Sequence, residues 1–128
     1  MVAALPKKKT KGSVALTAFF NIAEKWELTV AEQMLLLGME SQSTFYKYKN
    51  DPASASVDRD MMERISYVLG IFKDLQILLK DTKSADSWVK KPNKACPFNG
   101  RSALDVMSQG KVVDLYIVRQ YLASQKGV

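Results

Sequence analysis

The chain has 128 residues, of which 47% are hydrophobic and 25% charged, and its net charge is +6. This length fits one domain or two very small ones, and the composition is typical of a globular protein, not of a disordered or fibrous one. No apolar run approaches the roughly 20 residues that cross a bilayer, and MVAALPKKKTKGS has no apolar core after its lysines, so we expect no membrane span, no secretory signal and a cytoplasmic protein.

The basic charge is concentrated at the start of the chain. Residues 1–12 hold four lysines and no acidic residue, whereas the other 116 residues carry 15 basic and 13 acidic side chains. We expect residues 1–12 to be a disordered basic tail. Such a tail either serves solubility or rests on a polyanion such as nucleic acid.

Helical periodicity predicts two helices between residues 13 and 37. We expect Ser13 to cap the first helix, which runs to about Trp26. Its apolar stripe consists of Leu16, Phe19, Phe20 and Ala23. Thr29 opens the second helix because Glu32, three residues later, completes a capping box, and Gly38 is a suitable stop.

A third helix is predicted from Ser41 or Gln42 to Lys49, before the small-residue connector ASASV at residues 53–57. Pro52 ends this helix because proline disfavours helical backbone in the residue before it. Two short helices joined at a glycine, the second rich in Tyr and Lys, are typical of a DNA-binding helix-turn-helix. Phe45 and Tyr48 have the spacing of buried residues. The polar face left for the major groove and its phosphates consists of Ser41, Gln42, Ser43, Thr44, Tyr46, Lys47 and Lys49.

A long helix follows, which Asp58 is expected to cap. Its wide apolar stripe consists of Met61, Ile65, Val68, Leu69, Phe72, Leu75, Leu78 and Leu79. Gly70 interrupts the pattern and marks either a bend or a close packing contact. We expect the domain boundary at residues 51–57, with units at 13–57 and 58–128, and the long helix packed on both.

The last 50 residues predict three further helices around a loop. A short helix starts at Thr82 or Ser84, holds Trp88 and ends before Pro92. Another starts at Ser102, three residues before Asp105, and closes at Gly110. The final helix runs from about Val112 to Gln125, and the residues expected to face inward are Val113, Tyr116, Ile117, Tyr121 and Leu115.

The residue types for most enzyme chemistry are missing. The chain has no histidine, and Cys96 is its one cysteine, so it lacks an intramolecular disulfide, an ordinary zinc site and the usual partner of a cysteine nucleophile. No glycine-rich phosphate loop occurs. We therefore predict no catalytic residue, no metal site and no cofactor, and a protein that is not an enzyme.

Two stretches resemble known families. LTVAEQMLLLGMESQSTFYKYKND resembles the Xre/Cro helix-turn-helix, although it is one residue longer between glycine and hydrophobic anchor, has Met34 where a small residue is usual, and lacks arginine in its second helix. The second half resembles the toxin-binding domain of Xre/MbcA/ParS-like antitoxins. The shared features are Leu69-Gly70-Ile71, Trp88, Pro92-Asn93, Phe98, Gly100, RSALDVM at residues 101–107, Val118, Arg119 and Tyr121-Leu122.

The resemblance implies an all-α antitoxin of a type II toxin–antitoxin pair, with a helix-turn-helix unit before a compact helical toxin-binding domain. The partner it implies is a RES-domain toxin that depletes NAD. The antitoxin would cover the toxin's NAD site, and the complex would repress its own operon. The implied partners are thus this toxin, operator DNA, a second copy of the chain and a hetero-oligomer with the toxin, with nucleoid association when operator-bound.

The expected toxin contacts lie in the loop and at the C-terminal end. They are Trp88, Pro92, Asn93, Phe98, Gly100, Arg101, Arg119, Tyr121, Gln125, Lys126, Gly127 and Val128. Some have structural alternatives. Trp88 and Phe98 can instead fill the core, Asn99 to Ser102 can be only a turn and cap, and Arg101 and Arg119 can pair with Asp105 or Asp114. The rival functions are a stand-alone regulator whose second half dimerises, and an interaction module without DNA binding.

Overall fold

The computed structural model describes residues 10–127. Within that range the chain forms seven α-helices, two short 3-10 helices and no strand, which confirms the all-α prediction. The elements are α1 (Lys11–Lys25), α2 (Val30–Leu37), α3 (Gln42–Asn50), η1 (Pro52–Ser54), α4 (Arg59–Leu78), α5 (Thr82–Ser87), η2 (Trp88–Lys90), α6 (Ala103–Met107) and α7 (Val112–Gln125).

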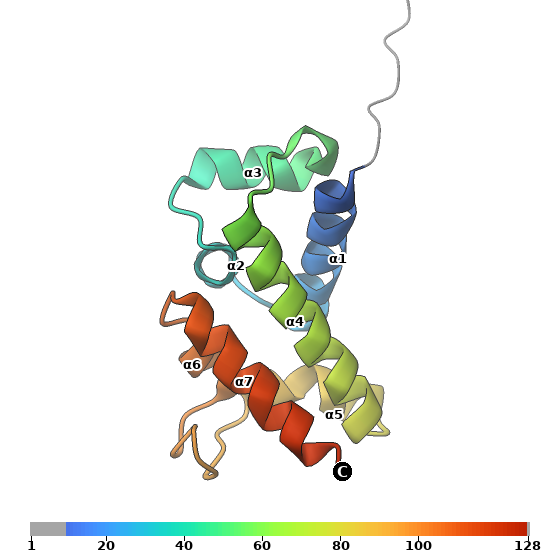
Figure 1. The fold of residues 1–128 in the computed structure, drawn as a ribbon, viewed down its shortest axis with the longest axis vertical. Coiled ribbons are helices and arrows are strands. Elements are labelled where there is room, and N and C mark those ends of the chain that lie inside the picture. The colour runs from blue at the N-terminus through green and yellow to red at the C-terminus, as the bar shows by residue number, and fades with distance from the viewer. Residues whose placement is uncertain (1–9, 128) are drawn as a thin grey trace, which may run out of the picture.

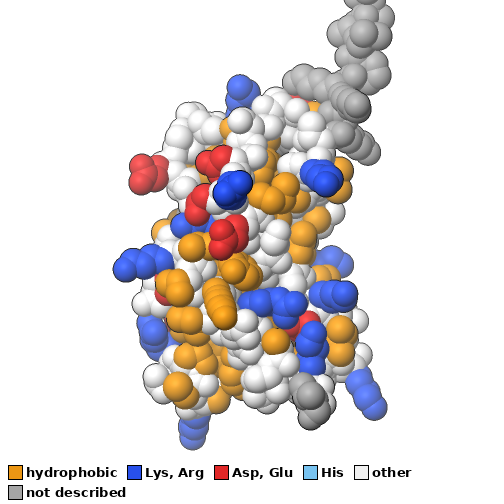
Figure 2. Space-filling view, in the orientation of Figure 1, with side chains coloured by type: hydrophobic (Ala, Val, Ile, Leu, Met, Phe, Trp, Pro, Cys, Tyr) orange, Lys and Arg blue, Asp and Glu red, His pale blue; other side chains and the backbone are white. Residues whose placement is uncertain are grey.

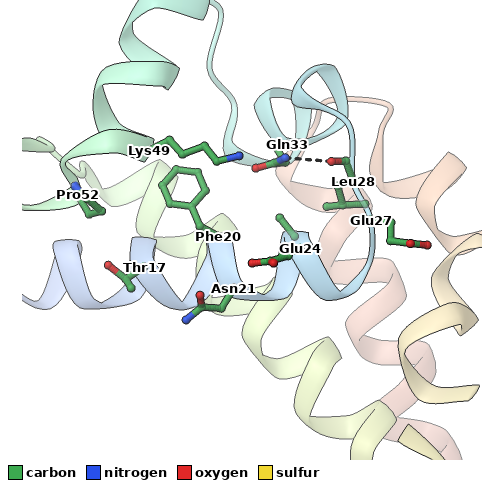
Figure 3. A pocket seen from close by; sticks show the side chains of 10 residues that line it. Thr17, Phe20, Asn21, Glu24, Glu27, Leu28, Gln33, Lys49 and Pro52 are labelled. Atoms are coloured by element: carbon green, nitrogen blue, oxygen red, sulfur yellow. Dashed lines mark hydrogen bonds between the residues drawn. The ribbon is translucent and has the colours of Figure 1, made fainter. Parts of the chain in front are cut away.

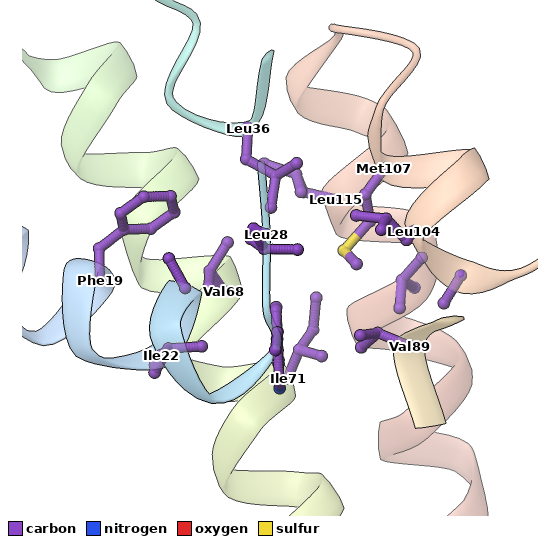
Figure 4. Packing of buried hydrophobic residues seen from close by; sticks show 14 of the residues in the cluster. Phe19, Ile22, Leu28, Leu36, Val68, Ile71, Val89, Leu104, Met107 and Leu115 are labelled. Atoms are coloured by element: carbon purple, nitrogen blue, oxygen red, sulfur yellow. The ribbon is translucent and has the colours of Figure 1, made fainter. Parts of the chain in front are cut away.

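Helix α4 runs diagonally through the molecule, with α1 on one side and α7 beside it in the same direction (Figure 1). Helices α2 and α3 lie at the amino end of α4, while α5 and the loop before α6 lie at the other end. One continuous core joins the two ends, because Leu36 of α2 packs near Leu115 of α7 and Met107 of α6 (Figure 4). No helix within residues 10–127 is long and apolar enough to cross a membrane.

Local sequence signals explain where most helices begin. The capping boxes Thr29–Glu32 and Ser102–Asp105 form as expected, and the Asp58 side chain accepts a hydrogen bond from the backbone N–H of Met61 at the start of α4. Each such cap satisfies a backbone donor that the helix itself cannot satisfy.

The predicted start of the first helix is wrong by three residues. Thr10, not Ser13, is the N-cap of α1, and Ser13 is the reciprocal partner in that capping box. Lys11 and Gly12, expected in the tail, are therefore helical; the rest of the tail, residues 1–9, and Val128 lie outside the described residues. The short helix before the loop begins at Thr82, one of the two predicted starts, and Asp81 caps it. It ends at Ser87, so Trp88, expected within it, instead begins η2.

The prediction for the inward face of α7 is wrong for three residues. Val113, Tyr116 and Ile117 are 50%, 38% and 36% exposed. The buried residues of this helix are Asp114, Leu115, Val118 and Leu122. Apolar residues occur on two faces of α7, so periodicity does not show which face packs on α4.

Candidate DNA-binding and partner-binding surfaces

Helices α2 and α3 form the helix-turn-helix. Gly38 caps α2 in the left-handed conformation, at a φ of 72° that favours glycine. Ser41 then caps α3 through its side chain. Phe45 is fully buried and meets Phe20 of α1 edge-to-face at 5.7 Å, so α3 is anchored on α1 by its apolar side.

The polar side of α3 faces solvent as expected. Ser41, Gln42, Ser43, Tyr46, Lys47 and Lys49 are exposed, and Thr44 is half-buried. Tyr48 is also half-buried, and its hydroxyl accepts a hydrogen bond from the backbone N–H of Ser56 at 3.3 Å. The structure thus separates an anchored and an open face on α3, as DNA reading requires.

Lys49 lies at the edge of this open face. A cavity of about 490 Å³ lies between α1 and the helix-turn-helix, and the Lys49 side chain extends over Phe20 toward Gln33 within it (Figure 3). The Gln33 amide donates to the Leu28 carbonyl at 3.1 Å, whereas its buried Oε1 has no hydrogen-bond partner. The Lys49 side chain therefore points toward the side of α3 that packs on α1, away from the open face. Lys47, which is exposed on the open face, is the better candidate for a phosphate contact.

A buried arginine joins the helix-turn-helix to the second half of the chain. Arg64 of α4 is 9% exposed. Its Nε donates to Asp60 Oδ2 at 2.9 Å, one terminal nitrogen donates to the carbonyl of Leu35 at 3.3 Å, and the other donates to the carbonyl of Gly110 at 3.0 Å. A Cβ on Gly38 would lie 2.8 Å from Arg64 Nε, so this glycine also makes room for the guanidinium.

A second polar cluster joins α4 to α7. Asp74 is 1% exposed and accepts from Arg119 and, at 2.9 Å, pairs with Lys126. Of the alternatives left open for Arg119, pairing with Asp105 or Asp114 does not occur, because those two carboxylates cap the starts of α6 and α7. Lys126, expected to reach the toxin, is likewise held by this internal ion pair.

Gly70 is a packing contact, not a bend. Helix α4 continues through it without interruption. A Cβ there would lie within 3.0 Å of Arg119 Cδ and even closer to its Nε. Because Gly70 has no side chain, the Arg119 side chain can lie against the backbone of α4 at this position and reach Asp74.

Three aromatic rings gather beside the end of α7. Phe98 meets Tyr121 edge-to-face at 4.9 Å, and Trp88 stacks on Tyr121 at 6.2 Å. Phe98 is fully buried and belongs to the core, so it offers no surface to a partner in this conformation. Trp88 and Tyr121 are half-buried and line a groove of about 240 Å³ together with Gln125.

The loop between η2 and α6 is closed by its own backbone. Asn93 N–H donates to the Arg101 carbonyl at 3.0 Å, and Gly100 N–H donates to the Asn93 carbonyl at 2.7 Å. Gly100 has a φ of 94° and faces open space. Pro92 and Arg101 are exposed, and Gly127 lies exposed after the end of α7. A loop pre-ordered in this way loses little entropy when it binds a partner.

Apolar side chains also cover an open face of α7. Val113, Tyr116 and Ile117 are exposed there, and Tyr116 stacks on the half-buried Tyr67 of α4 at 6.0 Å. Figure 2 shows hydrophobic side chains gathered over α7 and the adjoining part of α4. We call Tyr67, Val113, Tyr116 and Ile117 the α7 face.

Sequence reasoning missed Arg64 and Asp74. Both fall on the buried side of α4, among Met61, Ile65, Val68, Ile71 and Leu75. Their position on an apolar stripe could have revealed them, because a charged residue on the buried side of a helix needs a buried partner.

No cluster of potential metal ligands occurs within residues 10–127.

Comparisons with known proteins agree with this arrangement. The profile of the antitoxin Xre-like helix-turn-helix domain matches residues 6–70, and that of the antitoxin Xre/MbcA/ParS C-terminal toxin-binding domain matches residues 74–127. The two matches meet inside α4, the helix that packs on both α1 and α7. The uncharacterized protein y4oB of Sinorhizobium fredii (strain NBRC 101917 / NGR234) is 47% identical over 112 residues, which cover 88% of this chain and 84% of that protein. The chain therefore belongs to the Xre/MbcA/ParS antitoxin family, with a helix-turn-helix domain followed by a toxin-binding domain.

Proposed function

We propose that this chain neutralises a RES-domain toxin by binding it and covering its NAD site. The observation that carries the proposal is the amount of apolar surface left open on the toxin-binding half. The α7 face and the groove beside Trp88 and Tyr121 lie within or beside the matched range 74–127. Exposed apolar patches with aromatic residues are typical of protein-binding surfaces. The chain itself carries no catalytic residue in this proposal.

The residues expected from the sequence to contact the toxin differ in their exposure to solvent. Trp88, Pro92, Asn93, Gly100, Arg101, Tyr121, Gln125 and Gly127 all have exposed or half-buried positions. Phe98, Arg119 and Lys126 act indirectly in this proposal, because the first supports Trp88 and Tyr121 and the other two hold α7 on α4.

We also propose that the chain binds its own operator and does so as a homodimer or as a hetero-oligomer with the toxin. Residues 10–70 carry six basic and eight acidic side chains, so one helix-turn-helix has little attraction for DNA. Two half-sites bound together compensate for weak binding at each. The protein would act in the cytoplasm and associate with the nucleoid when bound to the operator.

Co-expression with the product of the neighbouring gene tests the toxin assignment. We expect a RES-domain protein that co-purifies with this chain and consumes NAD only when the chain is absent. A purified complex that still hydrolyses NAD at the rate of the free toxin, or a neighbouring product that does not bind, would refute the assignment.

The α7 face also favours a second candidate, a stand-alone regulator whose toxin-binding half only dimerises. Such a protein buries the α7 face against its own copy and needs no toxin. A gel-shift assay of the chain alone, together with its mass in solution, separates the two. If the chain alone forms a dimer that binds the operator fully, and this dimer does not bind the neighbouring gene product, the result would favour the stand-alone regulator.

A further inference from the structure

We propose that Arg64 fixes the angle between the helix-turn-helix and the toxin-binding half, and thereby sets the half-site spacing that a pair of chains accepts in DNA. This inference rests on the proposed operator binding by two copies. It makes Arg64 a positioning residue, because its guanidinium is buried and contacts backbone groups of the protein itself.

The geometry at Arg64 joins three elements at one point. The side chain leaves α4, and its two terminal nitrogens donate to Leu35, in the last turn of α2, and to Gly110, in the turn before α7. Asp60 holds the third guanidinium nitrogen, which fixes the plane of the fork. The accepting carbonyls lie 29 and 46 residues away in sequence from Arg64.

The apolar contact between the same elements is less directional than these hydrogen bonds. Leu36 packs near Leu115 and Met107 in the common core (Figure 4). Burial of such side chains is favourable but non-directional, so it tolerates small rotations. Hydrogen bonds to two carbonyls from one planar group are directional, and they lose strength when either element turns.

The end of α2 leads through residues 38–41 into α3, which Phe45 also anchors on α1, so the angle held at Leu35 helps to set the position of the recognition helix. Leu35 itself is 42% exposed and lies 3.9 Å from where a Cβ on Gly110 would be, beside the start of α7. When two chains associate through their second halves, the separation of their α3 helices depends on this angle. Two-fold related recognition helices fit half-sites about one DNA turn apart.

The test measures how strictly the protein discriminates half-site spacing. Full-length chain, Arg64→Gln and Arg64→Lys are titrated with the operator upstream of the gene, and with the same operator carrying two or three extra base pairs between half-sites. Arg59→Gln is the matched control, since Arg59 is an exposed arginine at the first position of the same helix. The affinity ratio of the two DNAs for one protein sample is independent of the folded fraction, so instability of a variant does not obscure the result.

We expect the wild type and Arg59→Gln to bind the altered spacing about tenfold or more weakly, the order of loss that one bad contact causes. Both Arg64 variants should reduce this ratio to about threefold or less, because neither glutamine nor lysine can bridge both carbonyls in the same plane. An unchanged ratio in the variants, or a wild type that binds the operator without discriminating spacing, would overturn the role of Arg64 and leave operator binding standing. A wild type that binds no operator, whether alone or in complex with the toxin, would overturn both proposals.

Discussion

The carboxylate of Asp74 on α4 accepts a hydrogen bond from the guanidinium of Arg119 on α7, 45 residues later in the chain. Asp74 is buried, while the Arg119 side chain is 32% exposed. A buried ion pair adds little net stability, because desolvation opposes the attraction, but removing one partner leaves the other charge buried and unpaired. We therefore expect the pair to favour the observed packing of α7 on α4 over other arrangements.

Arg119→Met should destabilise the fold. Lys126 remains beside Asp74, so we expect a loss of about 2 to 3 kcal/mol in the free energy of unfolding, below the full cost of an unpaired buried charge. Urea denaturation measures it. In the double variant Asp74→Asn/Arg119→Met the loss should be clearly smaller than the sum of the single losses, and strict additivity would mean that the two side chains do not interact.

Gly70→Ala should also destabilise the protein, against the usual trend. In a helix interior, alanine is ordinarily more stable than glycine by roughly 0.5 to 1 kcal/mol. Here the added Cβ meets Arg119 at its Cδ, Nε and Cζ atoms, and the ion pair with Asp74 prevents that side chain from moving away freely. The same substitution in an Arg119→Ala background should be neutral or stabilising. A stabilised Gly70→Ala single variant would contradict the packing role.

These contacts show which features the sequence predicted and which it did not. Capping boxes such as Thr29–Glu32 and stops such as Gly38 involve residues a few positions apart, so the helix order and bounds could be predicted closely. The inward face of α7 and the partners of Arg64 and Arg119 depend on which helices meet in three dimensions. Periodicity does not encode that choice when apolar residues occupy two faces of one helix, as Val113 and Leu115 do.

The two lysines of α3 should contribute unequally to operator binding. Lys47 is exposed, whereas Lys49 extends toward Gln33. Lys47→Ala should therefore lower the slope of log affinity against log salt by about 0.9, the value for one phosphate contact, and Lys49→Ala by much less. Gel shifts at several salt concentrations test this, with circular dichroism as the folding control. Equal changes in slope would show that Lys49 leaves the cavity to reach the DNA.

The N-terminal cap of α5 should be lost at low pH, when Asp81 becomes protonated. Hydrogen bonds from the side chain and then the backbone of Ser84 hold the pKa of Asp81 below its ordinary value of 3.8. Because the folded-state pKa is depressed, the cap contributes fully above the ordinary value and is lost as the pH falls through the folded one. The amide shift of Ser84, followed by NMR, should titrate with a midpoint below that of an aspartate in an unstructured peptide. A midpoint at or above the peptide value would contradict the cap.

Two variants at the C-terminal end can separate two roles of this end, which are to hold α7 on α4 through Lys126 and to cover the toxin's NAD site. We call residues 124–128 the C-terminal segment. Lys126 pairs with buried Asp74, so removing the whole segment would disturb the fold as well as shorten the chain. Lys126→Ala keeps the length and loses the ion pair, while deletion of residues 127–128 shortens the C-terminal segment and keeps the ion pair.

If the C-terminal segment occludes the toxin's NAD site, the deletion should weaken neutralisation while leaving the urea midpoint unchanged. Lys126→Ala should do the opposite, with a stability loss of about 1 kcal/mol or less because the lysine is partly exposed. NAD hydrolysis by a fixed amount of toxin, measured at equal occupancy of each variant, gives the comparison. Complete inhibition by the shortened chain would exclude the C-terminal segment as the blocking element. The loop that carries Pro92, Asn93 and Arg101 would then be the next segment to vary, since its own backbone hydrogen bonds hold it in place.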